Sequence, residues 1–198
     1  MKVYNTIPIA LVGKIGDKVG EFAHLKMDDS THAIATISYE HHEVHAGSYY
    51  EASDTTTNIG EETEPADAIQ LTWTTPATKE IHMTIHASCT TAAVYTFTEA
   101  YTGGGANGDL VTAYNRNRIL HSHKPSGMVI YKQGADVVTG GTVLESYTLT
   151  TGKFDAGETR ASQEWILKKS TTYAAALYLA GAGVAAIQLS WYEHTNKS

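Results

Sequence analysis

The sequence predicts an all-β protein: a single domain of β-sandwich or jelly-roll-like architecture over residues 31–198, preceded by an irregular N-terminal arm over residues 1–30. The composition favours strands, because threonine, tyrosine, valine and isoleucine are frequent while the chain has only 14 lysines and arginines. Short alternating apolar and polar segments are separated by turn residues at regular intervals. No segment has the apolar spacing of a long amphipathic helix. A length of 198 residues suits one domain with its own core.

The arm is predicted from its irregular pattern, since residues 1–30 contain Gly13, Gly16 and Gly20, mixed charges and no sustained periodicity. The domain then begins with two predicted strands, and polar or glycine-rich loops are expected at 53–67 and 101–110. The predicted strands are 31–40, 42–52, 68–75, 81–88, 91–100, 128–133, 142–151, 164–170, 172–181 and 183–194. Many short strands without a βαβ rhythm indicate a sandwich, a jelly roll or a barrel.

Two segments resemble membrane or targeting sequences without meeting their requirements. Residues 172–191 are long enough to span a bilayer, but they are rich in alanine and glycine and alternate in polarity, so we expect two strands around the AGAG turn. Residues 1–13 have a short apolar run broken by Pro8, which argues against a signal peptide. The sequence therefore predicts no association with membranes.

Charge and cysteine content exclude further classes of function. The net charge is −7 and no basic stripe is present, so we expect no nucleic-acid partner. The single cysteine, Cys89, excludes an intramolecular disulfide and a zinc-thiolate cluster within one chain. We expect Cys89 to be a small buried residue, and Trp73, Trp165 and Trp191 to pack in the core.

The segment SYEHHEVHAGSYY, residues 38–50, is rich in histidine and raises the question of a metal site. On a strand His41, Glu43 and His45 share one face, and two histidines with a carboxylate are the ligands of a non-haem iron centre. These residues would span about 13 Å, which is too far for one metal ion, so a second strand would have to contribute. His82 and His86 share a face of another strand and are the remaining metal candidates.

The alternative is a structural strand whose half-exposed histidines make hydrogen bonds or subunit contacts. No sequence motif indicates a catalytic residue or a cofactor site, so the sequence predicts a protein that is not an enzyme and binds no cofactor. The segment AYNRNR, residues 113–118, could bind a carboxylate or a glycan, or form a subunit contact. Several tyrosines could line a sugar-binding surface or fill subunit seams: Tyr49, Tyr50, Tyr95, Tyr101 and Tyr114.

Several spaced blocks of the sequence resemble the capsid decoration proteins, also called head auxiliary or cement proteins, of tailed bacteriophages. The blocks are residues 24–53, 71–87, 113–118, 163–173 and 185–197. The resemblance implies a structural virion protein that assembles as a homotrimer or a smaller oligomer in the bacterial host cytoplasm. It would bind the major capsid protein on the outer surface of the capsid and stabilise the shell by multivalent contacts. It implies no catalytic residues, and it suits an N-terminal arm that becomes ordered on assembly.

Two other functions remain open at this point. A carbohydrate-binding virion module, such as a head fibre or tail protein, would use the tyrosines to contact the host. A metal-dependent jelly-roll enzyme would use His41, Glu43 and His45 with His82 or His86. If the chain is a decoration protein with histidines in a subunit seam, its oligomer is expected to weaken as the pH falls toward about 5.

Overall fold

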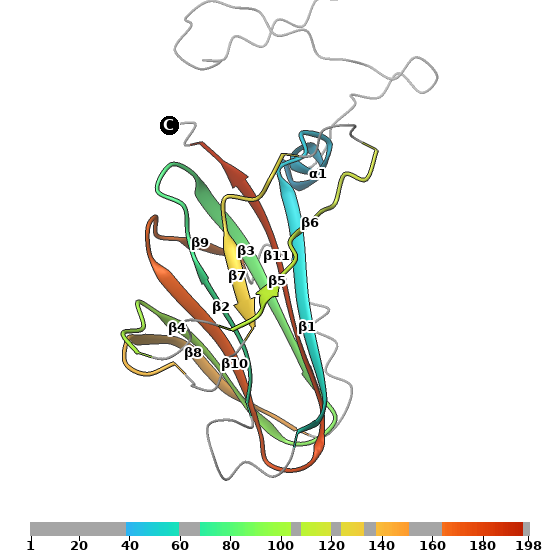
Figure 1. Cartoon of the computed structure of the whole chain (residues 1–198), viewed down its shortest axis with the longest axis vertical. Coiled ribbons are helices and arrows are strands. Elements are labelled where there is room, and N and C mark those ends of the chain that lie inside the picture. Colours follow the sequence, from blue (N-terminus) through green and yellow to red (C-terminus); the bar gives the residue numbers. More distant parts are fainter. Residues whose placement is uncertain are drawn as a thin grey trace, which may run out of the picture. The chain divides into compact units, whose positions relative to one another are not determined.

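The computed structural model describes residues 39–59, 68–103, 108–119, 124–132, 138–150 and 164–195. These residues form one helix and eleven strands (Figure 1). The elements are α1 (Tyr39–His45), β1 (Tyr49–Ile59), β2 (Ala68–Thr74), β3 (Glu80–Cys89), β4 (Ala93–Glu99), β5 (Leu110–Val111), β6 (Tyr114–Asn115), β7 (Val129–Lys132), β8 (Thr142–Leu149), β9 (Trp165–Leu167), β10 (Thr172–Leu179) and β11 (Gly183–His194).

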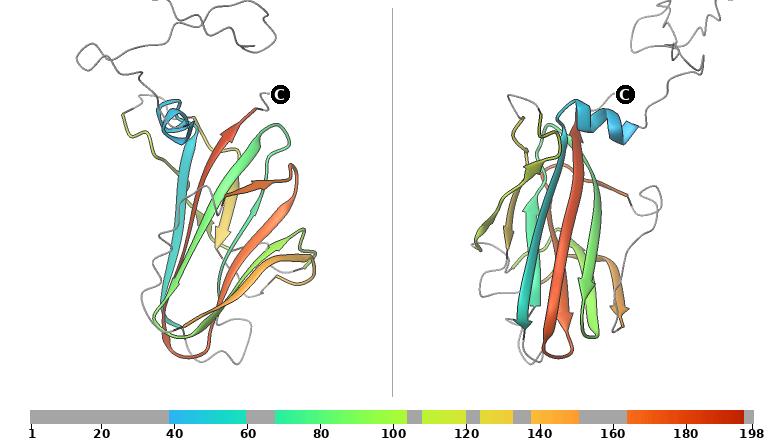
Figure 2. Two further views of the ribbon diagram at one scale, coloured as in Figure 1. Left: turned by 180° about the vertical axis from the view of Figure 1, so that it is seen from behind. Right: turned by 90° about the vertical axis from the view of Figure 1, so that its right-hand side faces the viewer.

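The strands form two antiparallel sheets that pack against each other, so the predicted all-β sandwich is confirmed. The five-stranded sheet has the order β6-β1-β11-β3-β9, and the six-stranded sheet has the order β5-β7-β2-β10-β4-β8. Figure 2 shows these sheets from behind and from the side. The compact unit that contains them spans Glu40–Asn196. The arm predicted over residues 1–30 lies outside the described residues.

The pairing of eight of the strands is nested in the manner of a jelly roll. Along the chain these are β1, β2, β3, β4, β8, β9, β10 and β11. The first pairs with the last, the second with the seventh, the third with the sixth, and the fourth with the fifth. A long antiparallel hairpin that is rolled up gives this pattern. The short strands β5, β6 and β7 are inserted between β4 and β8 and extend both sheets at one edge.

The alternation predicted from the sequence places one face of each strand in the core. Ile81, Met83 and Ala87 of β3 are buried between the sheets, whereas His82 and His86 lie on the outer face of the five-stranded sheet. Trp73 stacks on Phe97 with ring centroids 6.0 Å apart, and Trp191 is fully buried. Trp165 packs against the same cluster, and its ring meets that of Phe97 edge to face with centroids 5.3 Å apart. The core positions expected for the three tryptophans are therefore confirmed.

Cys89 is buried, as expected, and burial raises the pKa of its thiol. Residues 172–194 form two strands joined by a turn at 180–182, which confirms the reading against a membrane helix. These two strands belong to opposite sheets, so the turn joins the two layers and does not close a hairpin. Within the described part of the chain, no helix has the length and apolar character to cross a bilayer.

The strand predicted at 42–52 is wrong in its first half. Residues 39–45 form α1, and the strand begins only at Tyr49. The predicted strand at 31–40 lies almost wholly outside the described residues. The helical residues contain only one aliphatic side chain, Val44, and Gly47 ends a helix here rather than bending a strand.

Candidate functional site

The histidine-rich segment forms a two-turn helix whose end is set by Gly47. Gly47 has a φ of 69°, the left-handed conformation that glycine adopts most readily. Its N–H donates to the carbonyl of Val44 at 3.1 Å, and the N–H of Ser48 donates to the carbonyl of Glu43 at 2.9 Å. This pair of hydrogen bonds is a Schellman motif, which stops the helix and turns the chain into β1.

A helix changes which histidines are neighbours. His41 and His45 lie one turn apart on an exposed face, and their Nε2 atoms are 2.8 Å from each other. Glu43 points elsewhere, is buried, and lies 3.2 Å from Nδ1 of His42. The predicted metal group of His41, Glu43 and His45 on one face therefore does not form.

The segment 114–119 lies beside α1 and is shaped by its asparagines. The side-chain oxygen of Asn115 accepts from the N–H of Asn117 at 2.9 Å, and that of Asn117 accepts from the N–H of Ile119 at 3.1 Å. Two successive turns of this kind orient the alternate residues outward. The side chains of Arg116 and Arg118 are consequently exposed. Ile119, at the end of the segment, is exposed to 89% of its full accessibility.

Hydrogen bonds fix this segment to α1 and to the start of β1. The amide of Asn115 donates to the carbonyl of Gly47 at 2.8 Å, and that of Asn117 donates to the carbonyl of His45 at 3.2 Å. The Arg116 guanidinium lies over the ring of Tyr49, 4.9 Å from its centroid. The segment is therefore held in position before any partner binds.

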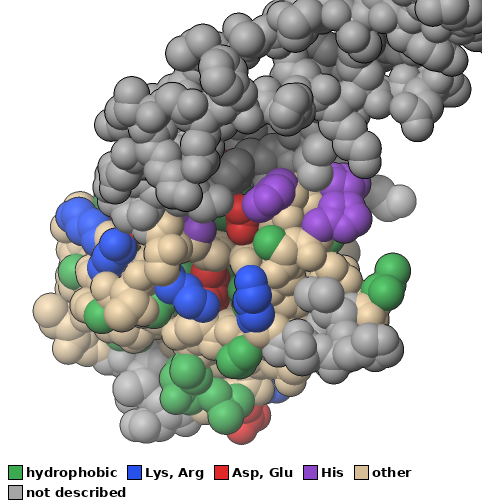
Figure 3. Space-filling model, turned by 90° about the horizontal axis from the view of Figure 1, so that it is seen from above, with side chains coloured by type: hydrophobic (Ala, Val, Ile, Leu, Met, Phe, Trp, Pro, Cys, Tyr) green, Lys and Arg blue, Asp and Glu red, His purple; other side chains and the backbone are tan. Residues whose placement is uncertain are grey.

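A cavity of about 460 Å³ opens between α1 and this segment. We call it the arginine pocket; its lining residues are Val44, His45, Arg116, Asn117, Arg118 and Ile119. Its walls combine apolar side chains with two guanidinium groups, which suits a partner that offers both a carboxylate and an apolar group. Figure 3 shows histidine side chains gathered at this end of the sandwich near lysine and arginine side chains.

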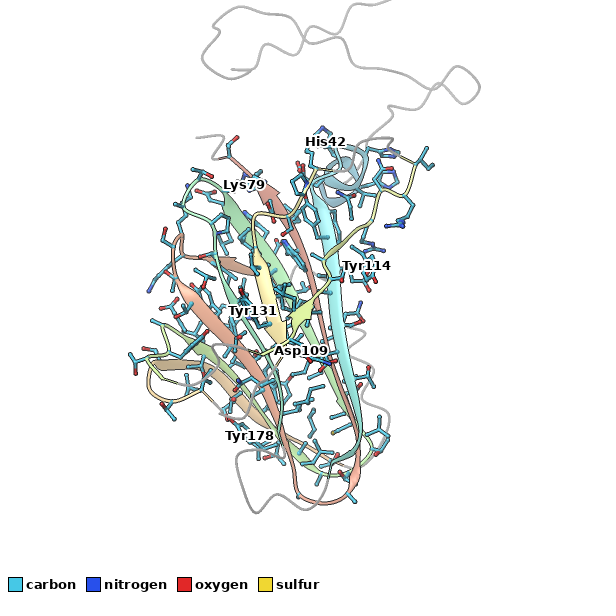
Figure 4. All side chains as sticks on the ribbon, in the orientation of Figure 1. His42, Lys79, Asp109, Tyr114, Tyr131 and Tyr178 are labelled. Atoms are coloured by element: carbon cyan, nitrogen blue, oxygen red, sulfur yellow. The ribbon has the colours of Figure 1, made fainter. Side chains whose placement is uncertain are left out.

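A buried carboxylate fastens the neighbouring loop to the core. Glu193 of β11 accepts hydrogen bonds from Lys79 at 2.7 Å, from the hydroxyl of Ser126 at 2.7 Å and from the N–H of Gly127 at 2.9 Å. The hydroxyl of Tyr50 donates to the carbonyl of Lys124 at 3.0 Å. Burial and the negative charge of Glu193 raise the pKa of Tyr50 to about 12. Figure 4 labels Lys79 and His42 at this same end of the sandwich.

A second cluster lies on the outer face of the five-stranded sheet. Among the described residues, Glu80, His82 and His194 form a group in which one possible ligand atom of each lies within 4.8 Å of the other two. The register of β3 and β11 explains this, because His194 lies opposite Glu80 and Tyr192 lies opposite His82. Desolvation of the ring is the main reason that the pKa of His82 is lowered.

The predicted metal candidates thus lie in three places: on α1, in the cluster of β3 and β11, and farther along β3. His82 joins a cluster with two residues that the sequence did not suggest, Glu80 and His194. His86 lies on the same strand face, opposite Gln188, and is outside the cluster. His82 lies on the strand predicted at 81–88 and Glu80 directly precedes that strand, so their spacing of two residues is a local signal. The contribution of His194 depends on the pairing of β3 with β11, which no local pattern reveals.

The tyrosines proposed for a sugar-binding surface are mostly structural. Tyr49, Tyr50 and Tyr95 are each only 1% exposed, so they do not form an open aromatic platform. Tyr114 is exposed and is the first residue of the segment 114–119 (Figure 4). Comparisons of the chain with protein-family models, curated proteins and solved structures find no match. The chemistry of the surface therefore carries the functional argument.

Proposed function

We propose that this chain is a structural virion protein of a tailed phage that decorates the outer capsid surface and binds the major capsid protein through the arginine pocket. The observation that carries the proposal is the preformed pocket between α1 and residues 114–119, with its outward-facing arginines and Ile119. Exposed arginine and tyrosine side chains grouped on a fixed backbone are typical of the centre of a protein interface.

The electrostatics favour a protein partner. Arg116 and Arg118 are two local cations on a chain whose net charge is −7. A nucleic acid would be repelled by most of such a surface, whereas an acidic peptide segment needs only the local charges. Ile119 adds an apolar group to this contact beside the two guanidinium groups.

The fold is compatible with this proposal without deciding it. Jelly rolls occur in viral capsid proteins, and also in lectins and cupins, so the architecture alone does not assign a function. In this chain the space between the sheets is filled by apolar side chains such as Trp73, Phe97 and Leu189. The distinctive chemistry lies on the outside, where an attachment protein would carry it.

Attachment would depend on repeated weak contacts. A homotrimer would present three arginine pockets to neighbouring capsid subunits, and the second and third contacts would form at high effective concentration. Native mass spectrometry of the purified full chain tests this step. A trimer supports it, and a monomer at every concentration would contradict the multivalent part of the proposal.

The binding test is cosedimentation of the purified chain with capsids assembled from the major capsid protein encoded in the same genome. We expect stoichiometric binding by the wild type and at least about a tenfold loss of affinity for the Arg116→Ala/Arg118→Ala double variant and for Ile119→Ala. Ile166→Ala and Lys132→Ala are matched controls, because Ile166 is exposed on β9 and Lys132 is partly exposed on β7. They should bind like the wild type. Absence of wild-type binding, or equal loss for the controls, would refute the proposal.

A further inference from the structure

We propose that Glu80, His82 and His194 form a binding site for one divalent transition-metal ion, with zinc as the best-suited ion. The site would clip the end of β11 to the start of β3 on the outer face of the five-stranded sheet. This inference is independent of the proposed attachment to capsids, because it rests on other residues.

The backbone already brings the three side chains together. Glu80 and His82 are two residues apart on β3 and therefore point to the same side, and His194 lies opposite Glu80 on β11. The ring centroids of His82 and His194 are 4.8 Å apart. In a tetrahedral site with bonds of about 2.0–2.1 Å, ligand atoms lie about 3.3 Å from one another. The groups within 4.8 Å must therefore close by about 1.5 Å at most, which side-chain rotations can supply.

The hydrogen bonds around the histidines are those of a metal site's outer shell. Nδ1 of His194 lies 3.1 Å from the carbonyl oxygen of Thr195, and because a carbonyl only accepts, Nδ1 carries the proton. The lone pair is then on Nε2, the atom through which His194 would bind a metal ion. Nδ1 of His82 lies 3.0 Å from the Tyr192 hydroxyl and 3.7 Å from the Glu164 carboxylate. Metal-binding histidines commonly hold their second nitrogen against such groups.

The charges in and around the cluster favour a dication. Two carboxylates, Glu80 and Glu164, lie beside imidazole rings, and all three proposed ligands are only partly exposed. Imidazole and carboxylate together suit zinc and its neighbours in the first transition row better than magnesium or calcium. The ammonium of Lys169, 3.6 Å from Oε1 of Glu80, is the one opposing charge that the described residues place on this carboxylate.

Three protein ligands leave one position of a tetrahedral ion for water. Glu164 is close enough to His82 to accept a hydrogen bond from Nδ1 of that ring after a small shift. The cluster therefore resembles an open site more than a closed structural one. The competing explanation for any metal binding is the exposed pair His41 and His45, whose spacing of one helical turn also allows two imidazoles to bind one ion.

The test is calorimetric titration of the metal-free full chain with Zn²⁺, together with the visible absorption spectrum of the Co²⁺ complex. We expect one ion per chain, and a loss of at least about tenfold in affinity for His82→Ala, His194→Ala and Glu80→Gln. His86→Ala is the matched control, since His86 lies on the same face of β3 and outside the cluster. Lys169→Met should strengthen binding severalfold, because it removes the competing cation from Glu80.

Two results would overturn the inference. The first is the absence of a saturable one-to-one site in the wild type. The second is binding that survives in His82→Ala and His194→Ala but is lost in the His41→Ala/His45→Ala double variant, which would assign the ion to α1. Because Glu80→Gln keeps the shape of the side chain, circular dichroism of that variant separates loss of a ligand from loss of folding. A zinc-dependent rise in the melting temperature of the wild type, absent in Glu80→Gln, is the corresponding stability readout.

Discussion

Glu193 shows how a single buried carboxylate can fix the surroundings of a surface site. Its side chain is fully buried, while its partner Lys79 is 32% exposed, so water screens the pair only on the lysine side. We predict that Glu193→Gln lowers the free energy of unfolding by about 2–3 kcal/mol. The ion pair with Lys79 is lost, and the NH₂ group of glutamine, itself a donor, replaces a carboxylate oxygen that accepted hydrogen bonds. Urea denaturation measures this.

A carboxylate in a wetter setting provides the comparison. Glu51 of β1 pairs with Arg116 at 3.8 Å and is 38% exposed, so Glu51→Gln should cost less than about 1 kcal/mol. If both variants lose the same amount, the burial of Glu193 is not what makes it important. An effect on the loop would appear separately, as faster proteolysis near residues 124–128 in Glu193→Gln.

Glu99 makes the stability of the protein depend on pH. The Lys168 ammonium, 2.7 Å away, is the main reason that the pKa of Glu99 is lowered, and the Tyr173 hydroxyl adds a second hydrogen bond at 2.8 Å. Because the folded pKa lies below the unfolded value, this carboxylate stabilises the fold above the unfolded pKa, and the contribution disappears as the pH falls through the folded pKa.

The expected result concerns the slope of stability with pH. Between about pH 6 and pH 3 the wild type should lose more free energy of unfolding than Glu99→Gln, so the two curves converge on acidification. Lys168→Met should flatten the curve nearly as much, and Tyr173→Phe less, in the order of their effects on the pKa. Parallel curves for the wild type and Glu99→Gln would show that Glu99 is not responsible.

At the scale of elements, α1 depends on its terminating glycine. Gly47 has a φ of 69°, which an alanine adopts only at a cost of about 1–2 kcal/mol. We predict that Gly47→Ala lowers the free energy of unfolding by that amount and weakens binding at the arginine pocket, since α1 forms one wall of it. Gly181→Ala is the control, because a Cβ there meets nothing within 4 Å. Equal effects of the two substitutions would contradict the role assigned to the left-handed turn.

The same element marks where local sequence patterns succeed and fail. The strands β2 and β3 alternate apolar and polar residues over their length, and both were predicted within a few residues of their bounds, as were β4, β10 and β11. In YEHHEVH only Val44 is aliphatic, so the spacing of apolar residues cannot distinguish a helix from a strand. The Gly47 that follows was the available signal, since a glycine just after a short polar segment commonly ends a helix.

At the scale of the whole molecule, the nested pairing could not be predicted from local patterns. β1 pairs with β11 across the length of the domain, and the cluster of Glu80 and His82 with His194 exists only because β3 lies on the other side of β11. Alternation gave the core faces and the fold class. Strand order depends on long-range contacts that carry no short-range signature, which is why His194 was missed although His82 was not.

This topology makes β11 the element on which the five-stranded sheet depends. It lies between β1 and β3, and its Ile187, Leu189 and Trp191 are fully buried. Burial of three such side chains contributes about 5–9 kcal/mol, comparable with the whole stability of a typical domain. We therefore predict that deletion of residues 183–198 abolishes cooperative unfolding, whereas deletion of 196–198 leaves it intact. Near-ultraviolet circular dichroism during thermal unfolding measures both. A cooperative transition in the longer deletion would mean that the six-stranded sheet folds alone, and the two layers would then have to be treated as separately stable units.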